Sequence, residues 1–260
     1  MAKTNPSAVA SLLKEIRSAL EAKADEKFRL ADSARRKSPL KSLGVRSSAV
    51  RGVAREIGTK GRGELDYDAA VALLDAAVSR KTREEILVAI DLLERFRREF
   101  NGSIFPHLEK WSAAADDIDV AEALGVQVAA PALAREPSRM ALVKKWARLK
   151  SLGKRRLAIL AASGLVTDGR REAGLVLEMC EHLLGEENPV LVSAVAGLLR
   201  DTTKVDAKAV QDFLFRRSID GNPEILRAGS ENLDAARRAA LIAKLEAQAG
   251  VPTQLAGAER

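Results

Sequence analysis

Residues 83–100 read Arg-Glu-Glu-Ile-Leu-Val-Ala-Ile-Asp-Leu-Leu-Glu-Arg-Phe-Arg-Arg-Glu-Phe, and their apolar positions recur every three or four residues. At this spacing Ile86, Ile90 and Leu93 share one side of a helix, and charged residues take the other side. No alternating pattern typical of a strand competes with it. The stretch therefore predicts an amphipathic helix that buries one face.

The same helical spacing recurs along the chain, with breaks at glycine and proline. Helices are expected at residues 6–20, 47–57, 68–78, 83–100, 117–130, 138–149, 154–163, 167–184, 189–203, 206–217 and 231–249, with breaks at Pro131, Gly153, Gly164, Gly185, Asn188-Pro189 and Gly221-Asn222-Pro223. Short helices joined by short turns are typical of an α-solenoid of stacked antiparallel helix pairs, as in HEAT-like repeats. No strict sequence period supports the repeat, so a compact helical bundle is the alternative architecture.

Composition agrees with an all-α fold, since aromatic residues make up only 3% and hydrophobic residues 47% of the 260 residues. We expect one helical-repeat domain over residues 1–249 and a frayed tail at 250–260. The single cysteine, Cys180, excludes an internal disulfide and is expected to be a buried thiol. With only His107 and His182 beside it, we expect no metal site.

No signal-peptide core and no apolar stretch of membrane-spanning length stands in the sequence, so a cytoplasmic location is expected. The glycine-rich string at residues 58–63 lacks the preceding strand and the terminal Lys-Ser/Thr of a nucleotide-binding loop. It is interpreted as a connection between helices, and no cofactor is implied.

Positive charge is concentrated in two segments of a chain whose net charge is +7. Residues 29–62 carry ten basic residues against two acidic ones. Residues 144–156 carry no acidic residue, one tryptophan, Trp146, and seven basic residues: Lys144, Lys145, Arg148, Lys150, Lys154, Arg155 and Arg156. Cations at such density repel one another unless anions neutralise them, so a polyanion such as DNA is the expected partner.

The stretch from Leu43 to Arg51 predicts a turn that leads into a helix capped by Ser47. Arg46 directly precedes this helix, and Arg51 lies within its first turns. Amides at a helix N-terminus together with arginines can hold a phosphate. Alternatively, Arg51 pairs with a neighbouring carboxylate, and Arg46 is an exposed residue of the turn that binds no ligand.

Four acidic residues gather at the start of the helix expected at 117–130: Asp116, Asp117, Asp119 and Glu122. Capping of the helix N-terminus is a sufficient explanation for them, because carboxylates there favour the helix dipole. Trp111, just before them, is interpreted as a core residue.

Three strings together resemble the AlkD family of DNA alkylation repair proteins, which are HEAT-like-repeat DNA glycosylases. The Leu43-Gly44-Val45-Arg46 turn with Arg51 resembles the family's Gly-Val/Ile-Arg turn and following helical arginine. Trp146 with Arg155-Arg156 and Ala158-Ile159 resembles its Trp-to-Arg-Arg segment, and residues 83–90 supply the third string. The resemblance covers about residues 30–217 and is fairly specific in the order and spacing of its motifs.

The resemblance implies an α-solenoid whose basic concave face holds duplex DNA and an activity that releases cationic N3- or N7-alkylated purines. Its Trp-Asp-x-x-Asp pattern falls on residues 118–122, with Ile118 in place of the tryptophan and Glu122 in place of the catalytic aspartate. Its second pocket tryptophan falls on Gly197. Glu122 and Asp119 are therefore the expected catalytic carboxylates.

The residues expected to contact DNA are Arg46, Arg51, Lys144, Lys145, Trp146, Arg148, Lys154, Arg155 and Arg156. The leading hypothesis is a monomeric DNA-binding helical-repeat protein of the alkylpurine DNA glycosylase family; excision of alkylated purines by it would need neither metal nor organic cofactor. One alternative is a non-catalytic homologue that binds damaged or branched DNA, since both expected tryptophans are absent. Another is a helical-repeat adaptor for other proteins.

Overall fold

The structure is a computed structural model that describes residues 6–36, 38–60, 65–167 and 171–249. In these ranges the regular structure is helical, with one isolated bridge between Lys41 and Thr82 and no strand. The predicted all-α class is confirmed. The chain divides into two compact units, Met1–Gly164 and Leu165–Arg260. A single domain over residues 1–249 stays a prediction, and the predicted frayed tail at 250–260 lies outside the described residues.

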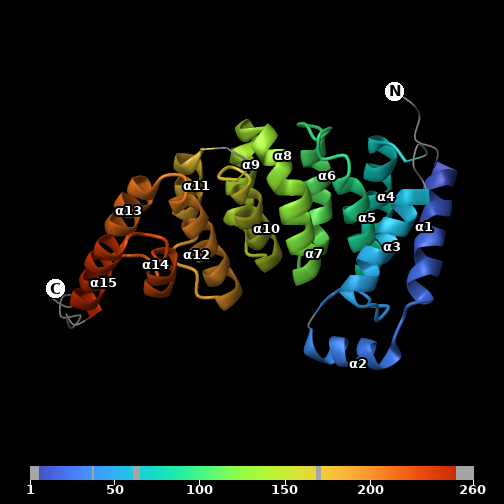
Figure 1. The fold of residues 1–260 in the computed structure, drawn as a ribbon, viewed down its shortest axis with the longest axis horizontal. Coiled ribbons are helices and arrows are strands. Elements are labelled where there is room, and N and C mark those ends of the chain that lie inside the picture. The colour runs from blue at the N-terminus through green and yellow to red at the C-terminus, as the bar shows by residue number, and fades with distance from the viewer. Residues whose placement is uncertain (1–5, 37, 61–64, 168–170, 250–260) are drawn as a thin grey trace, which may run out of the picture. The chain divides into compact units, whose positions relative to one another are not determined.

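The first unit is a stack of short helices that follow one another as neighbours (Figure 1). Its α-helices are α1 (Pro6–Glu21), α2 (Glu26–Arg35), α3 (Ser47–Lys60), α4 (Tyr67–Arg80), α5 (Arg83–Glu94), α6 (Ile104–Trp111), α7 (Ile118–Ala123), α8 (Ala130–Arg135), α9 (Met140–Ala147) and α10 (Leu152–Ser163). Three shorter helical segments connect some of them: the 3-10 turns η1 (Ser112–Ala114) and η3 (Pro137–Arg139) and the π-helix η2 (Leu124–Ala129).

Helix α5 is the centre of the first unit, because α1, α3, α4 and α7 all pack against it. The predicted apolar stripe is confirmed, since Ile86, Ile90 and Leu93 are completely buried. The helix ends at Glu94 rather than at Phe100 as predicted. Turns over the next residues bring Phe100 into the core, where its ring is buried and its carbonyl accepts a hydrogen bond from Arg135 Nε at 2.8 Å.

The helical path from α7 to α8 runs on through Pro131, so the predicted break at this proline is wrong. The π-helix η2 explains the continuity. Its wider turn lets the amide of Ala130 donate to the carbonyl of Gly125, five residues back. Proline lacks an amide hydrogen and disrupts regular α-helical bonding, and a π-helical turn just before it accommodates this disruption.

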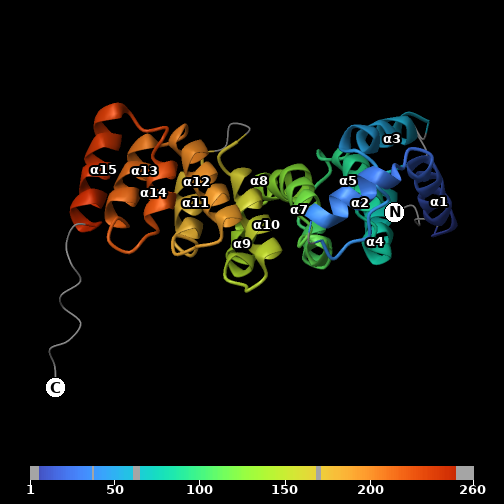
Figure 2. The same ribbon diagram turned by 90° about the horizontal axis from the view of Figure 1, so that it is seen from below.

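Helix α2 was not predicted, because its ten residues carry no continuous apolar stripe. Asp25 starts the helix by accepting a hydrogen bond from the amide of Phe28 at 3.0 Å. Seen from below, α2 lies in front of α4 and α5 (Figure 2). An ion pair of Asp32 with Arg83, at 2.6 Å, joins it to the start of α5. Polar contacts rather than a hydrophobic face therefore position this helix.

The second unit contains α11 (Ala173–Cys180), α12 (Pro189–Thr203), α13 (Ala207–Arg216), α14 (Pro223–Gly229) and α15 (Ala235–Ala249). Helix α12 packs against α11, α13 and α14. Helix α14 was not predicted, because Gly221-Asn222-Pro223 indicates only a break, whereas Asn222 caps this short helix by accepting a hydrogen bond from the Glu224 amide. The prediction of a buried thiol is confirmed: Cys180 is completely buried, and burial raises the pKa of its thiol to about 12.

Candidate nucleic-acid interface

The turn at Gly44 holds the start of α2 against the start of α3. Gly44 has a φ of +75°, and a Cβ at this position would stand 2.5 Å from Cβ of Arg29 and 2.6 Å from the carbonyl oxygen of Asp25. Any other residue would be strained and would clash here. The Asp25 amide donates to the Gly44 carbonyl at 3.0 Å. The turn that suggested a phosphate site therefore also packs two helices together.

Arg46 is held beside this turn by two contacts. Its guanidinium carbon lies 4.7 Å from the centre of the Phe28 ring, and its Nη2 lies 3.6 Å from a carboxylate oxygen of Asp25. The side chain nevertheless remains 65% exposed. Surface pairs of this kind are weak, so Arg46 is oriented by its neighbours and still accessible to an anion.

Arg51 lies on α3 at the edge of a hollow of about 340 Å³. The hollow is lined by Ser47, Val50, Arg51, Leu87, Asp91, Asp119, Glu122, Ala123, Val126 and Gln127. Arg51 is exposed, and it forms no ion pair within 4.0 Å with any residue that the structure describes. The structure thus brings one predicted DNA-binding arginine together with both predicted catalytic carboxylates.

The basic residues of the second segment lie on α9, α10 and the turn between them. Lys145, Arg148 and Lys150 are exposed, whereas Lys144, Lys154, Arg155 and Arg156 are partly buried. Ser151 caps α10, accepting a hydrogen bond from the Lys154 amide at 3.2 Å. Gly153 permits a close approach to the segment before α7, since a Cβ there would stand 2.7 Å from the amide nitrogen of Asp116.

Residues 144–156 contain no acidic residue, but acidic residues of other helices lie next to them in the structure. Lys154 Nζ is 3.7 Å from a carboxylate oxygen of Glu109 on α6, and Arg156 forms an ion pair with Glu122 on α7. Part of the positive charge is therefore already neutralised by neighbouring helices.

Trp146 requires a correction, because it was predicted to contact DNA. Its side chain is completely buried, and its indole nitrogen donates a hydrogen bond to Glu109. The indole therefore supports the packing of α9 and presents no surface to a ligand. Trp111 is also completely buried, as predicted, and donates to Asp75 at 2.8 Å.

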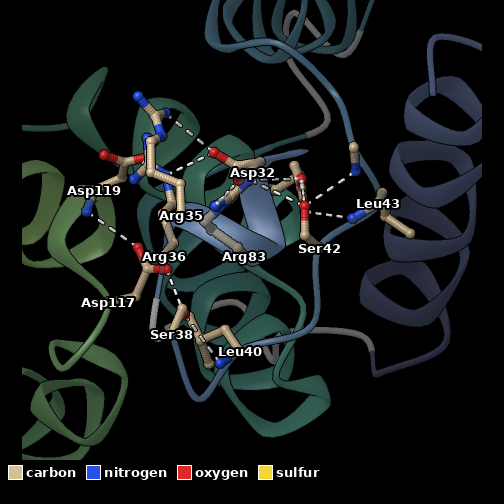
Figure 3. A network of polar contacts seen from close by, with 12 residues as sticks. Asp32, Arg35, Arg36, Ser38, Leu40, Ser42, Leu43, Arg83, Asp117 and Asp119 are labelled. Atoms are coloured by element: carbon tan, nitrogen blue, oxygen red, sulfur yellow. Dashed lines mark hydrogen bonds and ion pairs between the residues drawn. The ribbon is translucent and has the colours of Figure 1, made fainter. Parts of the chain in front are cut away.

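The acidic residues near α7 divide into structural and accessible groups. Asp117 is 1% exposed and caps the helix, accepting hydrogen bonds from the amides of Asp119 and Val120 at 3.1 Å each. It also accepts one from the Ser38 hydroxyl at 2.6 Å (Figure 3). Capping is thus confirmed for this residue. Glu122, by contrast, keeps half of its side chain exposed beside the 340 Å³ hollow.

Asp119 belongs to a network that ties α2 to α5 and α7 (Figure 3). Arg36 Nη1 lies 2.7 Å from a carboxylate oxygen of Asp119, and Arg36 Nε donates to Asp32 at 2.8 Å. Asp32 in turn pairs with Arg83. Burial by itself would raise the pKa of Asp32, but the hydrogen bonds from Arg83 and Arg36 outweigh it and hold the pKa below its ordinary value.

Asp91 is a further carboxylate of the hollow and was not predicted from the sequence. Burial raises its pKa, opposed by a hydrogen bond from Gln127 and by the charge of Arg51. Its one sequence signal is an acidic residue inside the apolar run of α5. The raised pKa means that this carboxyl keeps its proton to a higher pH than an exposed aspartate does.

Neither position of the expected pocket tryptophans carries an aromatic ring. Ile118 is 44% exposed at the start of α7. Gly197 lies on α12 of the second unit, where a Cβ would meet only Arg200 Nη2, at 3.8 Å.

Within the described ranges, no three His, Cys, Asp or Glu side chains form a group that could hold a metal ion. None of the helices that the structure describes is long and apolar enough to cross a membrane.

Comparison with known proteins gives one family and a similar fold. Residues 16–233 match the model of a family described as DNA alkylation repair enzyme. A solved structure described as a predicted DNA alkylation repair enzyme from Enterococcus faecalis is similar to this chain, with a TM-score of 0.64 and 15% identity. The similarity covers 82% of this chain and 98% of that one, and it supports the predicted helical-repeat fold. No curated protein sequence matches the chain.

Proposed function

Because the chain belongs to the DNA alkylation repair enzyme family, we propose that it binds duplex DNA and releases N3- or N7-alkylated purines from it. The binding surface consists of Arg46 and Arg51 at α3 together with the basic residues of α9 and α10. These cations would contact phosphates, which position the duplex without reading its sequence. The protein is proposed to act as a monomer.

The observation that carries the proposal is the position of Glu122. Its carboxylate lies at the 340 Å³ hollow and forms an ion pair with Arg156, the last residue of the Lys-Arg-Arg string on α10. A carboxylate is thus held at the edge of a surface suited to phosphates. The ion pair with Arg156 keeps this carboxylate oriented.

Glu122 would promote loss of the base from the sugar. An alkylated purine already carries positive charge, so its glycosidic bond is weak and the departing base needs no proton. As the bond breaks, positive charge develops on the sugar, and a carboxylate can stabilise that charge or orient the attacking water. Asp119 is a second candidate, although its pairing with Arg36 leaves it less available. Such a reaction requires neither metal nor organic cofactor.

The test is release of free 7-methylguanine and 3-methyladenine from methylated duplex DNA. We expect release by the parent protein and at least a hundredfold slower release by Glu122→Gln, a loss in the usual range for a group that acts on transition-state charge. Duplex binding should be retained in this variant. Glu15→Gln, an exposed carboxylate on α1, is the matched control. Absence of release by the parent protein would reject the enzymatic proposal.

A second candidate is a non-catalytic protein that binds damaged or branched DNA. It is favoured by the isoleucine at position 118 and the glycine at position 197, which leave no aromatic wall at either place. This candidate predicts duplex or branched-DNA binding with no base release. A protein-interaction adaptor predicts neither, so the same two measurements separate all three.

A further inference from the structure

A second hollow, of about 370 Å³, lies beside the first one in the first unit. It is lined by Arg51, Ala54, Arg55, Thr59, Asp91, Glu94, Arg95 and Gln127. Arg51, Asp91 and Gln127 line both hollows, so the two are adjacent. Neither Arg55 nor Arg95 was singled out by the sequence patterns.

Three arginines from two helices converge on this second hollow: Arg51 and Arg55 from α3, and Arg95 at the end of α5. All three are exposed, and none forms an ion pair within 4.0 Å with a described residue. Other arginines of this unit, such as Arg36, Arg83 and Arg156, are each paired with a carboxylate. Like charges that share a hollow repel one another, so an external anion would relieve the repulsion.

Gly58 fixes the position of the third arginine. It is buried on α3, and a Cβ at this position would overlap Nη1 of Arg95 and stand 3.0 Å from its Cζ. The guanidinium thus rests in the space that a side chain would fill. Glycine is unfavourable in the interior of a helix, and here its absence of a side chain admits the arginine.

Asp91 and Glu94 also line this hollow. These two carboxylates neutralise the charge of the three arginines less than exposed carboxylates would. Both are partly buried, and burial raises the pKa of each. The exposed charged groups around this hollow are the guanidiniums. A guanidinium presents a fork of N–H donors that matches two oxygens of a phosphate.

We propose that Arg51, Arg55 and Arg95 form a site for a backbone phosphate of DNA, which places the adjoining nucleotide at the hollow of Asp119 and Glu122. The inference rests on the proposed function and adds where one strand lies relative to the carboxylates. Of the three arginines Arg51 alone borders both hollows, so it is the one placed between the phosphate and the neighbouring sugar.

The test is a fluorescence-anisotropy titration of labelled duplex DNA with the full chain between 50 and 300 mM salt. Each lost phosphate contact lowers the slope of log affinity against log salt by about 0.9. Because the three arginines share one phosphate, Arg55→Ala/Arg95→Ala should lower the slope by about 0.9 and weaken binding about fivefold at 0.15 M salt. Arg97→Ala/Arg98→Ala, two exposed arginines outside the hollow, is the charge-matched control and should change binding much less.

Gly58→Ala provides a second test that removes no charge. Its added methyl should displace the Arg95 guanidinium and reproduce the loss seen in Arg95→Ala, while the circular dichroism spectrum stays helical. Unchanged DNA affinity in Gly58→Ala, or equal losses in the double variant and its control, would overturn the site.

Two outcomes separate this inference from its premise. If the parent protein binds no duplex DNA, the proposed function itself fails. If it binds DNA and the Arg55→Ala/Arg95→Ala variant binds equally well, only the phosphate site fails. Saturable binding of inorganic phosphate that is lost in the same variant, with DNA affinity unchanged, would make this a site for free phosphate and overturn the assignment to the DNA backbone.

Discussion

Replacing Arg83 by methionine should destabilise the first unit strongly, because this arginine neutralises buried carboxylates. Its side chain is 6% exposed and reaches Asp32 at 2.6 Å, Glu84 at 3.3 Å and the Ser42 hydroxyl at 3.0 Å. Asp32 and Glu84 are themselves almost completely buried. Methionine keeps much of the volume but leaves two buried acids without their main cation.

The expected cost is about 3–5 kcal/mol, the usual range when one partner of a buried ion pair is removed. For a folding unit of this size that corresponds to a fall of roughly 6–20 °C in Tm. Urea and thermal unfolding at pH 7, followed by circular dichroism, measure it directly. Lys208→Met is the control, since it breaks an ion pair on an exposed surface and should leave the midpoint unchanged.

The pH dependence follows from the lowered pKa of Asp32. A carboxyl whose pKa is lower in the folded state stabilises the fold above its unfolded pKa, and this contribution is lost as pH falls through the folded value. The parent protein should therefore lose stability below about pH 4, and Arg83→Met should show a smaller loss over the same interval. A cost below about 1 kcal/mol, or an unchanged pH profile, would refute the reasoning.

Three further predictions concern the remaining site residues and the core. Arg155→Ala/Arg156→Ala should weaken duplex binding and lower the salt slope by about 1–2, measured by anisotropy; an unchanged slope would exclude these arginines from the interface. Trp146→Ala should cost about 3–5 kcal/mol in urea unfolding but leave the salt slope of DNA binding as it is, because the ring is buried. Cys180 should resist alkylation at pH 8 until the protein unfolds, since burial raises its pKa to about 12; rapid labelling of the native protein would contradict its burial.

The sequence predicted those parts of the fold that local apolar spacing determines. The stripe on α5 could be read from residues 86–93 because a helix of any protein must bury such a face. Helix α2 could not, since its position depends on Arg36 and Arg83. These partners are close in space and cannot be paired from a single sequence. The continuity through Pro131 could not be predicted, because it depends on the π-helical turn before it, in which Gly125 packs closely against Leu160 of α10.

The sequence predicted several of the residues of the site, but not how the residues from different helices come together. The carboxylates at positions 119 and 122 could be located from the family pattern, and the structure brings both to the hollow of Arg51. Asp91 and Arg95 were missed because a charged residue on a helix gives no local sign of which hollow it borders.

The charge of a segment also misleads when its neighbours in space are unknown. Residues 144–156 contain no acid, yet Glu109 and Glu122 approach Lys154 and Arg156 from other helices. Those two cations must exchange a carboxylate for a phosphate, or share both, so each contributes less to affinity than an unpaired arginine. The arginines of α3 and Arg95 have no such partner among the described residues. The strongest phosphate contacts are therefore expected there, and Arg156 also holds Glu122 in place.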